Sequence, residues 1–234
     1  MSLYYIKHLS VRYRYTEPMK KTESGVFQNK NQLFTINQIK GVKVYNERLI
    51  RHKGKEYRSW NPYRSKLAAA ILNGFNFKIK TENNVLYLGA ATGTTVSHFS
   101  DILQNGTIYA VESSAVSMKK LLTLCTKRKN IIPILEDAFH PDRYSMLVPR
   151  ADIVYQDISQ RNQAEIFINN ISQYLDKKGY GVLMVKARSI DVSLKPKQAY
   201  EQVINKLKEK QLKIQYLIDL SPFEKDHAAI IVKF

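Results

Sequence analysis

The sequence has little of several features, and each absence narrows the class of protein. Only one of its 234 residues is a cysteine, Cys125, which excludes a disulfide framework and a cysteine-based zinc site. Because Cys125 lies among Leu121, Leu122 and Leu124, we expect a core thiol there. No segment approaches the roughly 18 consecutive apolar residues that a membrane span needs, and the N-terminus lacks the layout of a signal peptide. We therefore expect a globular, cytoplasmic protein with no membrane partner.

Acidic residues are also scarce. Asp and Glu number 20 against 37 Lys and Arg, which gives a formal net charge of +17. This excess is more than solubility requires and indicates a polyanionic partner. Nucleic acid is favoured over an anionic membrane surface, because no basic amphipathic helix with a wide apolar face accompanies the charge. Many of these charges belong to solvated helix faces, so charge alone names no activity.

The character of the sequence changes near residue 55. Residues 1–55 are rich in tyrosine and contain alternating stretches at 11–15 and 32–36, which predict a small antiparallel β domain. Residues 56–234 alternate between helix and strand patterns, which is typical of a mainly parallel sheet covered by helices on both faces. We expect an α/β fold with one domain at 1–55 and a second at 56–234.

Individual elements of the second domain can be placed from apolar patterns and capping residues. Asn61 and Pro62 read as the N-cap and first position of a helix that Gly74 can close. The last two strands are joined by a short loop without a helix, so they should form a hairpin that makes the last of seven strands antiparallel. The expected elements are a helix at 62–73, strand 85–88, helix 94–104, strand 107–111, helix 114–127, strand 131–135, strand 152–157, helix 162–175, strand 180–186, helix 196–210, and strands 213–219 and 227–233.

A ligand-binding turn follows the first strand of this domain. Gly89 and Gly93 lie between strand 85–88 and the next helix, where we expect them to let the backbone approach a ligand. A dinucleotide fingerprint needs a further glycine at position 91, which here is Ala91, so a pyrophosphate would fit poorly. S-adenosylmethionine has no phosphate, and the hydroxyls of Thr94 and Thr95 can hold its methionine end near the helix N-terminus. First-turn capping is an equally good interpretation of the two threonines.

Acidic residues follow the next two strands. Glu112 ends the second strand, where its carboxylate can accept hydrogen bonds from both hydroxyls of a ribose. Asp137 follows the third strand, where it can bond an adenine amino group. Ligand-facing groups after three successive strands are the layout expected for an adenosine cofactor at the carboxyl edge of a parallel sheet.

Polar side chains also end the later strands. Asp157 and Lys186 follow otherwise apolar runs, and both emerge at the edge that carries the cofactor turn. His227 opens the last strand at the neighbouring edge, and Lys66 lies on the helix before the sheet. Each residue alone is more often a solvated or structural group, but strand ends at this edge are where α/β active sites form. Because all four residues are expected near the same sheet edge, we predict that they form a catalytic set.

Four segments resemble fibrillarin, the family of 2′-O-methyltransferases of box C/D guide-RNA particles, in its archaeal form. The resemblance covers roughly residues 44–234. The sequence has no glycine-arginine-rich tail of the kind found in eukaryotic members. The chain departs from the family at Gln156, beside Asp157, where a small or apolar residue is more usual. The matching segments are Tyr57 to Ala68, Tyr87 to Thr95, Val185 to Asp191, and Lys225 to Ala228.

The resemblance implies a Rossmann-like S-adenosylmethionine-dependent methyltransferase fold and an activity on rRNA, with tRNA as a further substrate. It assigns catalysis to Lys66, Asp157, Lys186 and His227, the set that the strand ends bring together. It implies as partners a box C/D guide RNA, a Nop-domain scaffold protein and a kink-turn-binding ribosomal-type protein. The cofactor residues expected from the turn and from the resemblance are Gly89, Ala91, Thr94, Thr95, Glu112, Ser113, Asp137, Ala138, Asp157 and Gln160, with no metal ligand among them.

The chemistry leaves one role open. A ribose hydroxyl must lose its proton as it attacks the sulfonium methyl in line, and Lys186 can accept that proton as a neutral amine or, as an ammonium, stabilise the developing alkoxide. Asp157 favours the charged ammonium, so we expect it to orient Lys186. Two rival functions are a small-molecule O-methyltransferase and a non-catalytic RNA-binding scaffold with a vestigial cofactor pocket.

Overall fold

The computed structural model describes residues 20–22, 24–76 and 78–234. The alternating stretch at 11–15 lies outside these residues. Within them, no helix is long and apolar enough to cross a membrane.

The N-terminal part forms a five-stranded sheet in the order β1-β2-β3-β5-β4, with every neighbouring pair antiparallel, as predicted. Its last strand in the chain runs to Trp60, so this sheet extends beyond residue 55. The strands are β1 (Lys20–Lys21), β2 (Phe27–Asn29), β3 (Gln32–Ile36), β4 (Leu49–His52) and β5 (Lys55–Trp60).

The rest of the chain builds a seven-stranded sheet in the order β11-β12-β10-β9-β6-β7-β8. Strands β10, β9, β6, β7 and β8 are parallel, whereas β12 lies between β10 and β11 and is antiparallel to both. The predicted hairpin and antiparallel last strand are therefore confirmed. The strands are β6 (Val85–Leu88), β7 (Ile108–Glu112), β8 (Ile131–Leu135), β9 (Ala151–Gln156), β10 (Leu175–Lys186), β11 (Lys213–Asp219) and β12 (His227–Lys233).

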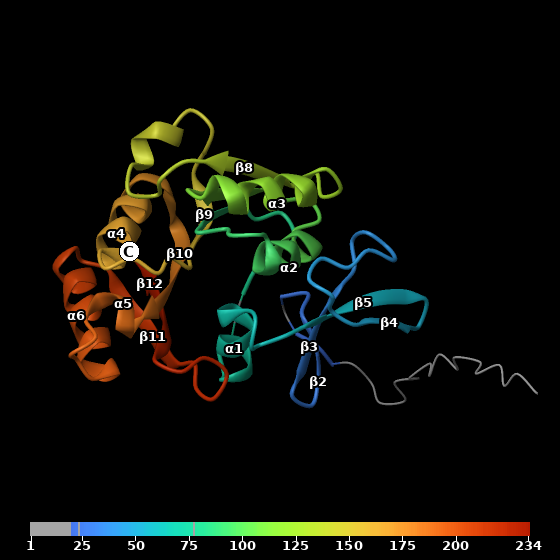
Figure 1. Cartoon of the computed structure of the whole chain (residues 1–234), viewed down its shortest axis with the longest axis horizontal. Coiled ribbons are helices and arrows are strands. Elements are labelled where there is room, and N and C mark those ends of the chain that lie inside the picture. Colours follow the sequence, from blue (N-terminus) through green and yellow to red (C-terminus); the bar gives the residue numbers. More distant parts are fainter. Residues whose placement is uncertain (1–19, 23, 77) are drawn as a thin grey trace, which may run out of the picture.

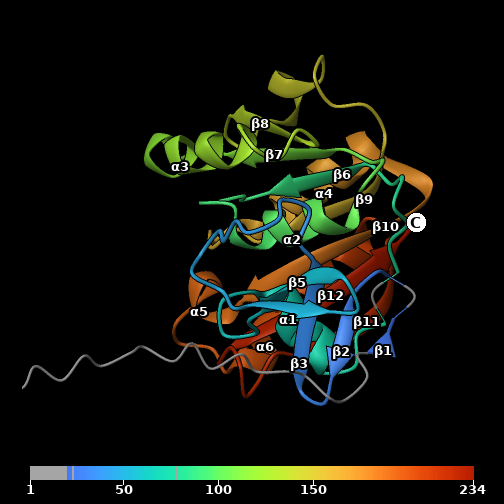
Figure 2. The ribbon, with the colours of Figure 1, turned by 90° about the vertical axis from the view of Figure 1, so that its right-hand side faces the viewer.

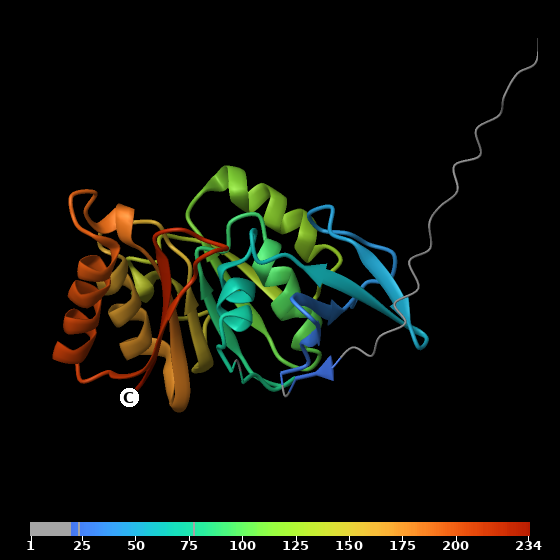
Figure 3. The same cartoon turned by 90° about the horizontal axis from the view of Figure 1, so that it is seen from below.

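Helices cover both faces of this sheet (Figure 1). Seen from below, α4 and α6 lie on one side of the strands and α1, α2 and α3 on the other (Figure 3). Each face has its own core, one built on Phe99 of α2 and Leu121 of α3 and the other on Phe167 of α4 and Val203 of α6. The helices are α1 (Lys66–Leu72), α2 (Thr94–Ile102), α3 (Ala115–Cys125), the 3₁₀ turn η1 (Pro141–Tyr144), α4 (Gln163–Tyr174), α5 (Ala187–Ile190) and α6 (Pro196–Glu209).

The start of the first helix was predicted wrongly. The side chain of Asn61 accepts a hydrogen bond from the Tyr63 amide and closes a separate turn instead of capping the helix. The N-cap is Ser65, whose hydroxyl accepts from the Ala68 amide, so α1 begins at Lys66. The predicted end is confirmed, because Gly74 has a φ of 99° and follows the C-cap.

Smaller differences concern β10 and Cys125. Strand β10 begins at Leu175, which pairs with Ala151, instead of at 180, and its register shifts before Tyr180. The polar residues in between hid this start from the apolar pattern. Cys125 packs half-buried against the first core, and burial raises the pKa of its thiol to about 11.

The N-terminal sheet lies beside α2 (Figures 1 and 2). A buried ionic network joins the two. Arg58 of β5 contacts Glu47 at 2.6 Å and Asp101 of α2 at 2.8 Å, and none of these three side chains is more than 1% exposed. Arg128, just beyond α3, contacts the second oxygen of Asp101 at 2.7 Å. The two sheets are thus held together by paired buried charges, and the cofactor turn lies at the end of the same helix.

Candidate active site

The turn between β6 and α2 has the shape expected of a binding turn, and its glycines also let it pack closely against the rest of the protein. Both lie in the left-handed region, with φ of 81° at Gly89 and 89° at Gly93. A Cβ at Gly89 would overlap the carbonyl oxygen of Asp157, and one at Gly93 would overlap the side chain of Leu124. The glycines therefore let the turn pack against the protein, and their role in the approach of a ligand stays a prediction, with Gly89 among the residues that line the neighbouring pocket.

A pocket of about 200 Å³ opens beside this turn at the carboxyl edge of the sheet. It collects residues that follow β6, β7, β8 and β9, as the strand-end argument predicted. The pocket includes every predicted cofactor residue except Thr94 and Thr95. Its lining is Gly89, Ala91, Val111, Glu112, Ser113, Glu136, Asp137, Ala138, Asp157, Ile158, Ser159 and Gln160.

Thr94 and Thr95 do not line this pocket, and their binding of the methionine end of the cofactor stays a prediction. Thr95 is buried, and its hydroxyl donates a 3.0 Å hydrogen bond to the hydroxyl of Ser65, the N-cap of α1. Thr94 lines a second hollow, together with Thr92 of the same turn. The structure therefore places Thr95 as a link between the turn and the helix that carries Lys66.

The two carboxylates of the pocket are held by backbone amides. Glu112 accepts a 2.7 Å bond from the Ala91 amide and a 2.8 Å bond from the Ser114 amide. Asp137 accepts a 2.9 Å bond from the Phe139 amide through Oδ1. Because each carboxylate oxygen can accept more than one hydrogen bond, both side chains keep acceptor capacity while their positions are fixed.

At the neighbouring strand ends, Lys66 and Asp157 form an ion pair. The distance from Nζ to Oδ1 is 2.7 Å, and the side chains are 18% and 19% exposed. We predicted from the sequence that Asp157 orients Lys186. In the structure, the ion-pair partner of Asp157 is Lys66 of α1. The pair fixes α1 against the end of β9.

Lys186 and His227 face each other across β10 and β12, where they are paired in the ladder. Nδ1 of His227 lies 2.7 Å from the carbonyl oxygen of Lys225, to which it donates, and this leaves Nε2 as the acceptor. Burial lowers the pKa of His227 below its usual range, and the positive charge of Lys66 lowers it further. His227 is therefore neutral near pH 7 and lies within electrostatic reach of the ion pair.

This geometry agrees with comparisons to known proteins. A sequence profile of the fibrillarin family matches residues 18–234. The chain belongs to the fibrillarin family. It is 48% identical over 214 residues to a fibrillarin-like rRNA/tRNA 2′-O-methyltransferase of Methanothermobacter thermautotrophicus, covering 91% of this chain and 96% of the relative.

Solved fibrillarin structures match over nearly the whole chain. One is Aeropyrum pernix fibrillarin with natively bound S-adenosyl-L-methionine, with a TM-score of 0.82 at 41% identity, covering 92% of this chain and 96% of that one. Another is a fibrillarin/Nop5p complex, with a TM-score of 0.84 at 43% identity, covering 92% and 99%. The predicted fibrillarin fold, with its methyltransferase sheet, is confirmed.

Two glutamines support the fibrillarin site, and the sequence had indicated only one of them, Gln156, as a departure from the family without a role. Gln163, fully buried at the start of α4, accepts from the Lys186 amide at 3.1 Å and donates to the Lys186 carbonyl at 3.2 Å. Gln156 donates a 2.7 Å bond to the Gln163 carbonyl. The only signal was the unusual glutamine before Asp157, since a residue that acts on a neighbour's backbone leaves no chemical motif.

Proposed function

We propose that this chain is an S-adenosylmethionine-dependent methyltransferase that transfers the methyl group to ribose 2′-hydroxyls of rRNA, and also of tRNA, as part of a guide-RNA particle. The observation that carries the proposal is the meeting of two sites at one sheet edge. The pocket with Glu112 and Asp137 lies beside Asp157, and Asp157 also belongs to the ion pair with Lys66. The fibrillarin relatives described above support both the reaction and the substrate class.

The residue types of the pocket fit the adenosine part of S-adenosylmethionine. Carboxylates at the ends of β7 and β8 suit the ribose hydroxyls and the adenine amino group. Hydrogen bonds from backbone amides hold these carboxylates in place before the cofactor binds. We assign cofactor binding to these residues, together with Gly89, Ala91, Ser113, Ala138 and Gln160. When bound, S-adenosylmethionine supplies a methyl group that is activated by its sulfonium charge.

We assign the removal of the proton from the ribose hydroxyl to Lys186. The ion-pair partner of the Asp157 carboxylate is Lys66, at 2.7 Å, and Lys186 forms no ion pair with any described residue. His227 is a weaker base than an ordinary histidine because its pKa is lowered, so its acceptor Nε2 orients the hydroxyl. As the oxygen–carbon bond forms and the carbon–sulfur bond breaks, the hydroxyl proton passes to the Lys186 amine.

The test is a pH–rate profile of Lys186→Arg with labelled S-adenosylmethionine and guide-directed RNA. Arginine keeps the positive charge but cannot accept a proton near neutral pH, so we expect kcat to fall by about 10²–10⁴-fold with cofactor affinity unchanged. Lys178→Arg, an exposed lysine on the same strand, is the matched control and should retain full activity. Full activity in Lys186→Arg would exclude the proton-acceptor role, and methylation of free small alcohols alone would refute the RNA substrate.

We further propose a Nop-domain scaffold protein as partner, a role that the fibrillarin/Nop5p complex supports. The box C/D guide RNA, the kink-turn-binding protein and the cytoplasmic location remain predictions from the sequence resemblance. Sizing the complex formed from the purified chain, candidate scaffold and guide RNA tests the assembly. A chain that methylates its target fully without either partner would contradict it.

A further inference from the structure

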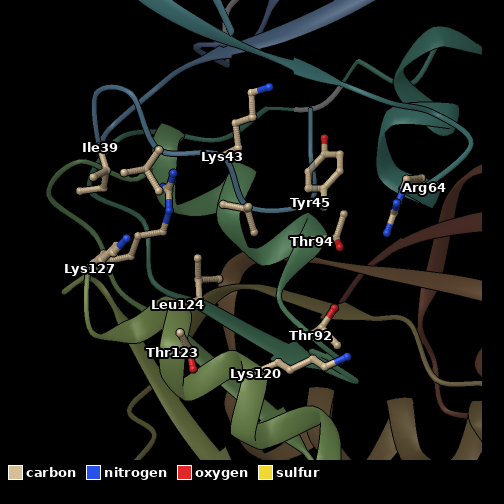
Figure 4. A pocket seen from close by; sticks show the side chains of 13 residues that line it. Ile39, Lys43, Tyr45, Arg64, Thr92, Thr94, Lys120, Thr123, Leu124 and Lys127 are labelled. Atoms are coloured by element: carbon tan, nitrogen blue, oxygen red, sulfur yellow. The ribbon is translucent and has the colours of Figure 1, made fainter. Parts of the chain in front are cut away.

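A second hollow, which we call the basic cleft, adjoins the cofactor turn and shares no lining residue with the pocket that contains Glu112 and Asp137. It has a volume of about 430 Å³ and opens between the loop at 39–45 and helix α3 (Figure 4). Thr92 and Thr94 of the cofactor turn lie between these two walls. The residues that form the basic cleft are Ile39, Val42, Lys43, Val44, Tyr45, Arg64, Thr92, Thr94, Lys120, Thr123, Leu124, Lys127 and Arg128.

The charge of the basic cleft is of one sign. Its lining, as the described part of the chain gives it, contains no aspartate or glutamate. Four of its cationic side chains belong to exposed residues that form no ion pair with any described residue; these are Lys43, Arg64, Lys120 and Lys127. Like charges that converge on a concave surface raise the local potential and attract anions.

Two arginines of the basic cleft are held in place by neighbouring groups. Arg128 is 1% exposed, and its Nη1 is held by Asp101, but its buried Nη2 has no hydrogen-bond partner among the described residues. Buried donors without an acceptor are rare in folded proteins. The guanidinium carbon of Arg64 lies 5.3 Å from the ring centre of Tyr45, whose hydroxyl is fixed by a 3.0 Å bond to the Ser59 carbonyl. Exposed Arg64 therefore offers an oriented donor to an anion in the basic cleft, and buried Arg128 adds positive charge beneath the surface of the cleft.

The size and place of the basic cleft favour a nucleotide chain as the occupant. Its volume lies in the range of small-molecule pockets, about 300–1,000 Å³, which suits one or two nucleotides better than a folded protein element. Apolar side chains such as Val44 and Leu124 can contact sugars or bases, while the cations contact phosphates. Arg64 is two residues before Lys66, so one end of the basic cleft adjoins the proposed catalytic groups.

We propose that the basic cleft binds the phosphate backbone of the RNA strand that enters the active site, a few nucleotides away from the methylated ribose. The inference rests on the proposed function, because it extends the RNA path from that active site. The cleft residues contribute affinity and take no part in the methyl transfer.

The test is a pair of charge reversals on and beside α3. Lys120→Glu with Lys127→Glu alters the basic cleft, whereas Lys119→Glu with Lys129→Glu makes the same change of net charge at exposed lysines that do not line it. Binding of a fluorescent single-stranded RNA is measured by anisotropy over a salt series. We expect the cleft variant to bind about tenfold or more weakly and to reduce the slope of log K against log salt by about 0.7 for each phosphate that the protein no longer neutralises, while the control changes much less.

Other outcomes would overturn the inference. Equal losses of affinity in both variants would mean that only net charge matters. A loss of S-adenosylmethionine affinity in the cleft variant would make the cleft part of the cofactor site. Unchanged RNA binding with abolished binding of poly-glutamate would assign the cleft to an acidic protein segment.

The methylation assay separates this inference from the proposed function. We expect the cleft variant to raise KM for RNA with kcat nearly unchanged. An unmodified chain that binds RNA through the basic cleft but transfers no methyl group would refute the function alone. A chain that methylates RNA with the same KM in both variants would refute the cleft alone.

Discussion

Asp101 of α2 accepts hydrogen bonds from four residues at the joint between the two sheets. It is fully buried and accepts from the Arg58 and Arg128 guanidinium groups at 2.8 and 2.7 Å, from the Thr35 hydroxyl at 2.7 Å and from the Gln38 amide at 3.0 Å. Asp101→Asn keeps the shape but removes the charge, which leaves two buried arginines facing one described carboxylate, Glu47. Breaking a buried ion pair in this way costs about 3–5 kcal/mol, so we expect the free energy of unfolding to fall by that amount.

Urea unfolding with two probes measures this destabilisation. Trp60 is the single tryptophan and stacks on His98 of α2 at 4.6 Å between ring centres, so its fluorescence reports on the joint, while circular dichroism reports on the whole chain. If the sheets unfold as one unit, both transitions coincide and shift together in the variant. Glu209→Gln, at an exposed residue on α6, is the control and should stay within about 0.5 kcal/mol. A destabilisation below about 1 kcal/mol for Asp101→Asn would refute the reasoning.

Three further predictions concern the site. Gly89→Ala places a Cβ against a neighbouring carbonyl at a φ of 81°, so we expect a cost on the order of 1–3 kcal/mol and weaker binding of S-adenosylmethionine, measured by calorimetry; unchanged affinity would contradict the packing argument. Gln163→Leu removes both hydrogen bonds to the backbone of Lys186, and we expect kcat to fall about tenfold or more with little change in KM, so a normal kcat would show that the strand end holds itself. Lys66→Met removes a charge that lowers the pKa of His227, so an NMR titration should find a higher pKa for His227 in the variant. That pKa should stay below the usual histidine value, because burial is the larger cause of the lowering. An unchanged pKa would refute the electrostatic contact between Lys66 and His227.

The sequence predicted those parts of the site that depend on strand order. Glu112, Asp137 and Asp157 end or follow strands of one parallel sheet, and the geometry of such a sheet brings their side chains to one edge regardless of distance along the chain. The partner of Asp157 could not be predicted in this way. Lys66 reaches it from a helix 91 residues earlier, and that contact depends on how α1 packs.

Local patterns were equally ambiguous at the first helix. Asn61 and Ser65 are both good N-cap residues, and only the tertiary position of the helix decides between them. The buried contact between Arg58 and Asp101 gave no signal, because both residue types are usually exposed and 43 residues separate them. Predictions from sequence were thus reliable where regular geometry repeats and failed where packing chooses a partner.

The position of β12 has a consequence for folding during synthesis. This strand follows β11 in the chain but lies between β11 and β10, so β10 keeps an open edge until His227–Lys233 has left the ribosome. An open, apolar strand edge invites pairing with other chains, which makes a partly synthesised chain vulnerable to aggregation. His227 lies on the same strand, so the nascent chain acquires the last of its proposed catalytic groups in the step that closes this edge.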